Sequence, residues 1–306
     1  MSSLKRVFSA VALLAMVGLF GGMSASAAPV NLGEAKCDNC HKSEDAVWKK
    51  TKHATSFKEI HRKPAVKDII AAAGGDANMR RNAVCTTCHY TMVSATPGAA
   101  PTAGTGTSCE GCHGPSSDWL AIHNNDKMPK AERVEKTVAA GMIRPEMLYD
   151  IAQNCLGCHE LARPGIAPET FAKMIDAGHP AGTDFELVSW LEGSVRHRFY
   201  PPDVTQNKEM TDAEKSRMFI IGHTGALVRA TEATGKVKNA KYEETLKKVD
   251  AGARAALDAI KGQVPEAAAV LAQPTDDNAR KLVAAIANKD LTPQVGKLLP
   301  PKTAFK

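Results

Sequence analysis

Hydrophobic residues recur at helical spacing along most of the chain, and no stretch alternates hydrophobic and polar residues long enough to predict a sustained strand. The pattern predicts helices over residues 130–140, 145–153, 168–177, 184–196, 211–234 and 242–261. Thr211 and Glu214 are spaced as a capping box, and Gly141 and Gly178 stand where two of these helices should end. We therefore expect an all-α fold.

Proline and glycine divide the remaining segments. A helical stretch between the first two cysteine pairs should be interrupted at Pro64 and end at Gly74-Gly75. Residues 94–108 are rich in Ala, Thr, Pro and Gly, which predicts a loop. Pro274, Pro293 and Pro300 should break the end of the chain into short pieces.

The first 27 residues have the features of a secretory signal peptide. Lys5 and Arg6 precede an apolar run over residues 7–20, and Ala25-Ser26-Ala27 follows as a cleavage site. An uncleaved membrane anchor is the alternative, but the run is shorter than the roughly 20 apolar residues that span a bilayer. No later segment is long and apolar enough to span one. We expect a soluble protein exported to the periplasm, with no stable membrane insertion after cleavage.

All eight cysteines fall in pairs spaced i, i+3, and a histidine follows each pair at once. The pairs are Cys37 and Cys40, Cys85 and Cys88, Cys109 and Cys112, and Cys155 and Cys158, followed by His41, His89, His113 and His159. Two thiols at this spacing can add to the two vinyl groups of one haem, and the adjacent imidazole can then bind its iron. Two tetrathiolate zinc sites or four redox-active pairs are alternatives, but neither accounts for the histidines. The motifs predict four covalently bound haem c groups, which would use every cysteine.

Composition and charge agree with this interpretation. Only 5% of the residues are aromatic, so the haems would fill part of the core. The formal net charge is +6, and Lys5 and Arg6 contribute two of these charges. Each oxidised haem would add about one negative charge through its propionates, so the mature protein should be near neutral. No dense Lys/Arg tract with interleaved aromatic residues is present, and nucleic-acid binding is not expected.

A haem iron needs a second axial ligand unless it is left open, and six histidines lie outside the motifs. His53, His123, His179 and His197 are our candidates for distal ligands. His61 is the alternative to His197, since both have basic neighbours and either could instead lie at the surface. His223 falls on the hydrophobic stripe of a predicted helix, where a structural role is favoured, and scattered methionines favour core packing.

Three features stand out together: Trp48 through His53-Ala54, the third motif written Cys109-Glu110-Gly111-Cys112-His113-Gly114-Pro115, and His123 downstream. In these features the chain resembles the tetrahaem cytochrome c-554-like family of multihaem c-type cytochromes. A wider group of c-554-like cytochromes also resembles Ala177-Gly178-His179-Pro180, Phe185-Glu186-Leu187 and His197. The resemblance covers roughly residues 34–200. It implies a mostly helical protein with closely stacked haems, and distal roles for His53, His123 and His179. The best-known relatives take electrons from hydroxylamine oxidation and keep one haem iron open, whereas His61 and His197 offer extra ligands here.

These observations predict a tetrahaem cytochrome domain over residues 28–206 and a helical C-terminal extension over residues 207–306. The expected function is single-electron transfer between a quinol-side or periplasmic donor and a terminal reductase, so the partners would be cytochromes or reductases. The alternative is an oxidoreductase with one open haem acting on a small nitrogen or sulfur species. Arg196, Arg198 and Tyr200 could line its pocket, or could form a solvated turn or a docking patch. A gas sensor or a structural subunit is a third reading.

Overall fold

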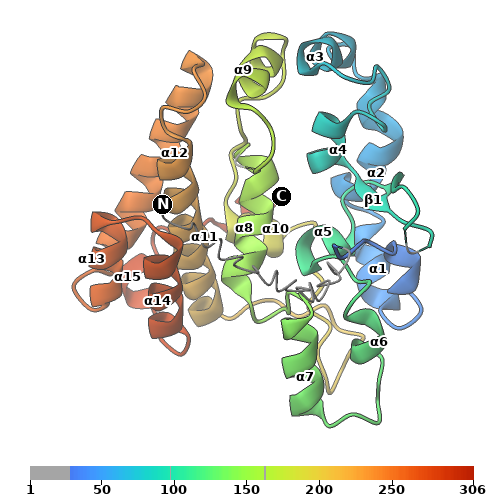
Figure 1. The fold of residues 1–306 in the computed structure, drawn as a ribbon. Coiled ribbons are helices and arrows are strands. Elements are labelled where there is room, and N and C mark those ends of the chain that lie inside the picture. Colours follow the sequence, from blue (N-terminus) through green and yellow to red (C-terminus); the bar gives the residue numbers. More distant parts are fainter. Residues whose placement is uncertain (1–27, 97, 162) are drawn as a thin grey trace, which may run out of the picture.

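The computed structural model describes residues 28–306 except residues 97 and 162, so the predicted signal peptide lies outside the described residues. The chain is mostly helical, and the described residues also contain one small two-stranded sheet (Figure 1). The all-α class expected from the sequence is confirmed.

The described α-helices are α1 (Lys42–Trp48), α2 (Lys52–Glu59), α3 (Val66–Ala73), α4 (Ala83–His89), α5 (Cys109–His113), α6 (Leu120–His123), α7 (Lys130–Ala139), α8 (Leu148–His159), α9 (Pro168–Asp176), α10 (Leu187–Leu191), α11 (Asp212–Ala233), α12 (Ala240–Asp258), α13 (Pro265–Ala272), α14 (Asp276–Ile286) and α15 (Thr292–Val295). The 3₁₀-helices are η1 (Glu34–Lys36), η2 (Ile60–Arg62) and η3 (Lys302–Ala304). The strands are β1 (Thr91–Val93) and β2 (Thr102–Thr105).

Local sequence signals set many of these boundaries. The Thr51 hydroxyl accepts the Ala54 amide at the start of α2, and the Asn82 side chain accepts two amides at the start of α4. Gly74 ends α3 with φ 72°, a conformation that favours glycine. The predicted capping box of Thr211 and Glu214 is present at the start of α11.

Two sequence-based expectations are wrong. The segment over residues 94–108 contributes β2, which pairs antiparallel with β1, so that Val93 lies opposite Thr102. Strands of three and four residues are too short for alternation to be recognised. The helix expected over residues 184–196 is only α10, because the Glu186 carboxylate accepts the Val188 and Ser189 amides and starts the helix there. In contrast, α8 runs further than expected, through the fourth Cys-x-x-Cys-His motif.

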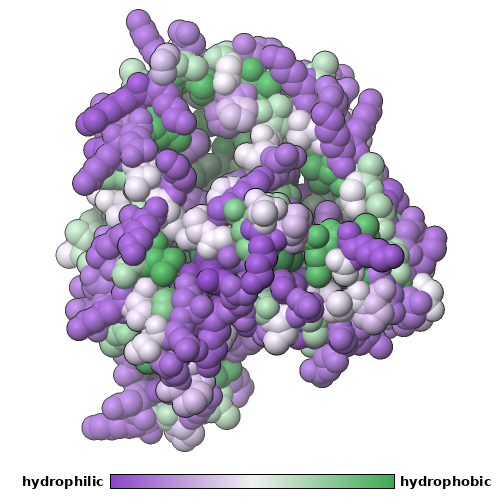
Figure 2. Space-filling view, turned by 180° about the vertical axis from the view of Figure 1, so that it is seen from behind, coloured by the Kyte–Doolittle hydropathy of each residue, from purple (hydrophilic) through white to green (hydrophobic). Residues whose placement is uncertain are grey.

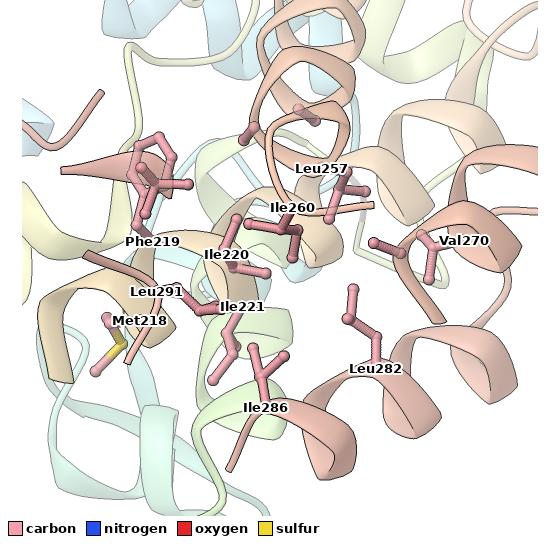
Figure 3. Packing of buried hydrophobic residues seen from close by; sticks show 14 of the residues in the cluster. Met218, Phe219, Ile220, Ile221, Leu257, Ile260, Val270, Leu282, Ile286 and Leu291 are labelled. Atoms are coloured by element: carbon pink, nitrogen blue, oxygen red, sulfur yellow. The ribbon is translucent and has the colours of Figure 1, made fainter. Parts of the chain in front are cut away.

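The largest hydrophobic core lies where α8 and α10 pack against α11 to α15. Figure 3 shows Ile220 and Ile221 of α11 directed toward Ile260, Leu282 and Ile286. These five side chains are at most 4% exposed. The helix α11 is therefore buried on most of its surface, and it packs along α12 and α8 (Figure 1).

The N-terminal half has little core of its own. Its buried hydrophobic cluster consists of Met79, Cys85 and Tyr90, with a few partly buried neighbours. From behind, hydrophobic side chains lie in hollows of a mainly hydrophilic surface (Figure 2). None of the described helices combines the length and the apolar character that crossing a bilayer requires.

Candidate haem-binding site

Three of the four Cys-x-x-Cys-His motifs form the last turn of a helix, namely α4, α5 and α8. The first motif instead follows η1 as a turn, and His41 stands at the N-cap position of α1 without a side-chain capping bond. In a helical turn, residues i and i+3 lie on one face. Both thiols of a motif therefore point to the same side, as attachment to one porphyrin requires.

Thiols of different motifs lie beside one another, and no disulfide links any of the eight cysteines. The Cys37 thiol is hydrogen-bonded to that of Cys109, which lowers the pKa of Cys37 and raises that of Cys109. The same contact occurs between Cys112 and Cys155 and between Cys158 and Cys88. The first motif therefore lies next to the third, the third lies next to the fourth, and the fourth lies next to the second.

Each motif histidine faces one histidine from outside the motifs. The ring centroids are 6.1 Å apart for His41 and His123, 6.1 Å for His89 and His179, 6.3 Å for His113 and His197, and 6.0 Å for His159 and His53. The two rings of each pair come from segments far apart in the chain. The fold therefore brings all four predicted distal candidates opposite a motif histidine.

The spacing of these ring pairs suits one iron atom bound between two imidazoles. A metal–nitrogen bond of about 2 Å on each side, with about 1 Å more from nitrogen to ring centre, separates two ring centroids by about 6 Å. The observed separations of 6.0 to 6.3 Å agree with this value. Direct ring stacking would bring the centroids closer, as for His159 and Phe185 at 4.8 Å.

Hydrogen bonds at Nδ1 orient five of these rings. His113 Nδ1 forms a hydrogen bond with the Ile143 carbonyl at 2.8 Å. His179 Nδ1 forms one with the Pro180 carbonyl at 2.8 Å, and His197 Nδ1 forms one with the Val195 carbonyl at 2.6 Å. His159 Nδ1 lies 3.2 Å from the Thr183 hydroxyl, and His41 Nδ1 lies 3.4 Å from a Glu44 carboxylate oxygen. A partner at Nδ1 leaves Nε2 free for a metal and makes the ring a better donor.

Burial keeps several of the rings uncharged, which metal binding requires. Burial, together with the facing His179, lowers the pKa of His89 to about 4. Burial, with smaller effects of His53 and Lys306, lowers the pKa of His159 to about 4. The pKa of His53 is also lowered by burial. These imidazoles are neutral at physiological pH.

Two buried indole groups next to the ring pairs support the fit to haem. The Trp119 ring lies 5.9 Å from that of His123, and the Trp190 ring lies 5.8 Å from that of His159. Both indole nitrogens are buried with no hydrogen-bond partner among the described residues. A haem propionate is an acceptor that could satisfy such donors. Spacing along the chain does not reveal that Phe185 and Trp190 lie beside His159, whereas Trp119 precedes His123 by four residues.

The remaining sequence candidates lie elsewhere. His61 lies in η2 and is exposed, and no ring pair within residues 28–306 includes it. His223 lies on α11, where its ring contacts Phe219 at 4.3 Å. Arg196 and Arg198 form ion pairs with glutamates of this chain. The described residues hold no group of three or more His, Cys, Asp or Glu side chains suited to a metal ion.

Cys-x-x-Cys-His segments that face further imidazoles form the kind of site that c-type cytochromes use to bind haem. The family model described as "Cytochrome c554 and c-prime" matches residues 36–114. The chain is also 27% identical over 157 residues to the cytochrome c-554 of Nitrosomonas europaea, a match that spans 47% of this chain and 64% of the relative. No solved structure gives a significant match. The comparisons support a cytochrome c-554-like family for this chain.

Proposed function

We propose that the chain is a periplasmic tetrahaem c-type cytochrome that carries single electrons between redox partner proteins. The observation that carries this proposal is that each of the four motif histidines faces a second imidazole at the separation one iron spans. When bound, each haem supplies an iron that takes up and releases one electron. Two imidazole ligands keep the coordination nearly unchanged between redox states, and this favours electron transfer over substrate binding.

The ligand set of this proposal has sixteen side chains. Thioether bonds would form at Cys37, Cys40, Cys85, Cys88, Cys109, Cys112, Cys155 and Cys158. The axial ligands would be His41 with His123, His89 with His179, His113 with His197, and His159 with His53. The haem-bearing part would comprise residues 28–206, and residues 207–306 would be a helical extension.

The contacts between thiols support an order of electron transfer. Cys37 contacts Cys109, Cys112 contacts Cys155, and Cys158 contacts Cys88. We infer that the haems form a chain in the order first, third, fourth, second. The first motif lies at one end, where the His41 side chain is 51% exposed. This end is suited to contact with a partner protein.

The proposed partners are a donor on the quinol side or in the periplasm and a terminal reductase of anaerobic or inorganic respiration. The name of the N. europaea relative is that of a cytochrome, and it supports this role without identifying a partner. The ion pairs of Arg196 and Arg198 within the chain give no support to an open catalytic pocket at that turn.

A haem count combined with electron paramagnetic resonance tests the proposal. The purified oxidised protein should contain four haems per chain, all low-spin, and the reduced protein should not bind carbon monoxide. His123→Ala should convert one haem to a high-spin form that binds carbon monoxide, while the matched variant His61→Ala should not. Fewer than four haems, or a high-spin iron in the unmodified protein, would contradict the proposal.

A further inference from the structure

The distal candidate His197 is held differently from the other three. His53 and His123 lie within helices α2 and α6, and the amide of His179 donates to the Met174 carbonyl at the end of α9. His197 lies on an exposed irregular turn between α10 and α11. Among the residues that the structure describes, only the nearby Val195 carbonyl hydrogen-bonds to its ring. Its position must therefore be fixed by its neighbours.

Both sequence neighbours of His197 are arginines that form ion pairs within the chain. Arg198 Nη2 lies 2.7 Å from Glu214 Oε1. Arg196 Nη1 lies 3.3 Å from Glu209 Oε1 and 3.5 Å from Glu192 Oε2. The Arg196 and Arg198 side chains are 24% and 19% exposed, and those of Glu192, Glu214 and Glu209 are 1%, 35% and 50% exposed. The pair of Arg196 with the buried Glu192 is therefore screened less than pairs on the open surface, whereas solvent partly screens the other two pairs.

The Asn207 side chain fixes the backbone on both sides of His197. Its Nδ2 donates to the Arg196 carbonyl at 2.6 Å, and its Oδ1 accepts the Arg198 amide at 2.9 Å. The Lys208 amide also donates to the Arg198 carbonyl at 3.1 Å. Three hydrogen bonds therefore tie the two residues that flank His197 to the segment leading into α11.

These contacts connect the turn to the start of α11 and the end of α10. Glu214, the partner of Arg198, belongs to the capping box that starts α11, and its Oε2 accepts the Thr211 amide at 2.8 Å. The body of α11 is buried in the largest core. The Met210 amide donates to Glu192 Oε1 at 3.0 Å, which joins the same segment to the end of α10.

We propose that Arg196, Arg198 and Asn207 are positioning residues that hold His197 opposite His113, so that the C-terminal helices fix the coordination of the third haem. The inference rests on the proposed function, in which His113 and His197 bind one iron. Without the three residues, the turn would gain conformational freedom and His197 would leave the iron more often. The open position could then accept a small diatomic ligand such as carbon monoxide.

Carbon monoxide binding to the reduced protein, with the high-spin fraction of the oxidised protein, tests this proposal. Arg198→Gln and Asn207→Ala should each raise the rate of carbon monoxide binding about tenfold, as loss of a charged hydrogen bond or of two backbone contacts predicts. Arg198→Lys keeps the positive charge and should raise the rate of carbon monoxide binding less than Arg198→Gln does. The matched control is Arg229→Gln, which removes the 2.8 Å pair with Glu232 on the same helix from an arginine that is 20% exposed.

A second pair of variants separates this proposal from the ligand assignment. His197→Ala should give one high-spin, carbon monoxide-binding haem; if it does not, the assignment of His197 as an axial ligand fails. If His197→Ala opens one haem while Arg198→Gln and Asn207→Ala behave as wild type, the positioning role is wrong. Glu214→Gln guards against misfolding, because glutamine keeps the capping box while losing the charge that faces Arg198. Glu214→Gln should raise the rate of carbon monoxide binding, as Arg198→Gln does.

Discussion

The His41 and His123 rings are close to parallel, with an interplanar angle of 23° at a centroid separation of 6.1 Å. The other three histidine pairs are strongly inclined, at 62° for His89 and His179, 65° for His53 and His159, and 89° for His113 and His197. With one iron bound in each pair, as proposed, the angle between the two ring planes would set how the ligands interact with the iron d orbitals. The haem held by His41 and His123 should then differ electronically from the other three.

This difference predicts the resonance spectrum of the oxidised protein. Parallel imidazole planes split the two iron d orbitals that point toward the ligands' π systems, whereas perpendicular planes leave them nearly degenerate. We expect one ordinary rhombic low-spin signal and three strongly anisotropic low-spin signals. His123→Ala should remove the rhombic signal and leave the others. Four similar rhombic signals would contradict the ring geometry.

The packing around Gly106 predicts that a substitution there would displace His53, the proposed axial ligand opposite His159. A Cβ atom at this position would overlap the His53 carbonyl oxygen, and the next residue is held by a 2.9 Å bond from Trp48 Nε1 to the Thr107 carbonyl. Gly106→Ala should displace α2, destabilise the protein by about 2 kcal/mol, and produce a high-spin haem at the His159 position.

Gly252 provides the matched control for that substitution. It lies within α12, and an added Cβ meets no atom within 4 Å. Gly252→Ala should stabilise the protein by up to about 1 kcal/mol through helix propensity and leave the haem spectrum unchanged. Thermal unfolding and absorption spectra measure both effects, and equal behaviour of the two variants would contradict the packing seen around Gly106.

The buried contacts of Glu110, a residue of the third motif, predict that replacing it lowers the stability of the protein. Its carboxylate is 4% exposed and accepts the amides of Leu32, Gly33 and Ser116 at 2.8 to 3.0 Å. Glu110→Ala would remove the acceptor of these three amides and of the Ser116 hydroxyl, and it should cost about 3 kcal/mol. Chemical denaturation measures this loss. The control Glu132→Gln, at an exposed pair with Lys136, should change stability by less than about 1 kcal/mol.

The burial of His223 predicts part of the fall in folding stability at acidic pH. Burial lowers its pKa from 6.5 to about 4, so between these values the unfolded chain binds a proton that the folded chain does not. The ring therefore costs no stability above pH 6.5, and stability falls as the pH drops toward 4, by up to about 3 kcal/mol from this residue. His223→Leu should reduce the loss between pH 7 and 4.5 in denaturant titrations. An unchanged loss would show that the ring does not resist protonation.

The sequence predicted the helical class and the four motifs because both depend on short-range spacing. It also named His53, His123, His179 and His197, but it left His61 open beside His197, since both have basic neighbours. The choice between His61 and His197 depends on the ion pairs that Arg196 and Arg198 form with glutamates distant in the sequence. Glu214, for example, lies 16 residues beyond Arg198. The order of the motifs in space could likewise not be predicted from the sequence, because it depends on thiol contacts between distant segments such as Cys37 and Cys109.

The uneven distribution of the hydrophobic core bears on the order of assembly. The helices α8 and α10 to α15 bury a large set of their own side chains, whereas the N-terminal half has only the small cluster around Met79, Cys85 and Tyr90. We therefore expect the C-terminal half to acquire its structure without a cofactor, while in the proposed cytochrome the N-terminal half would rely on bound haems to bury comparable surface. Before haem attachment, the chain would then have a folded C-terminal part and three accessible motifs, with the fourth motif at the end of α8, where Cys155 packs against the C-terminal core.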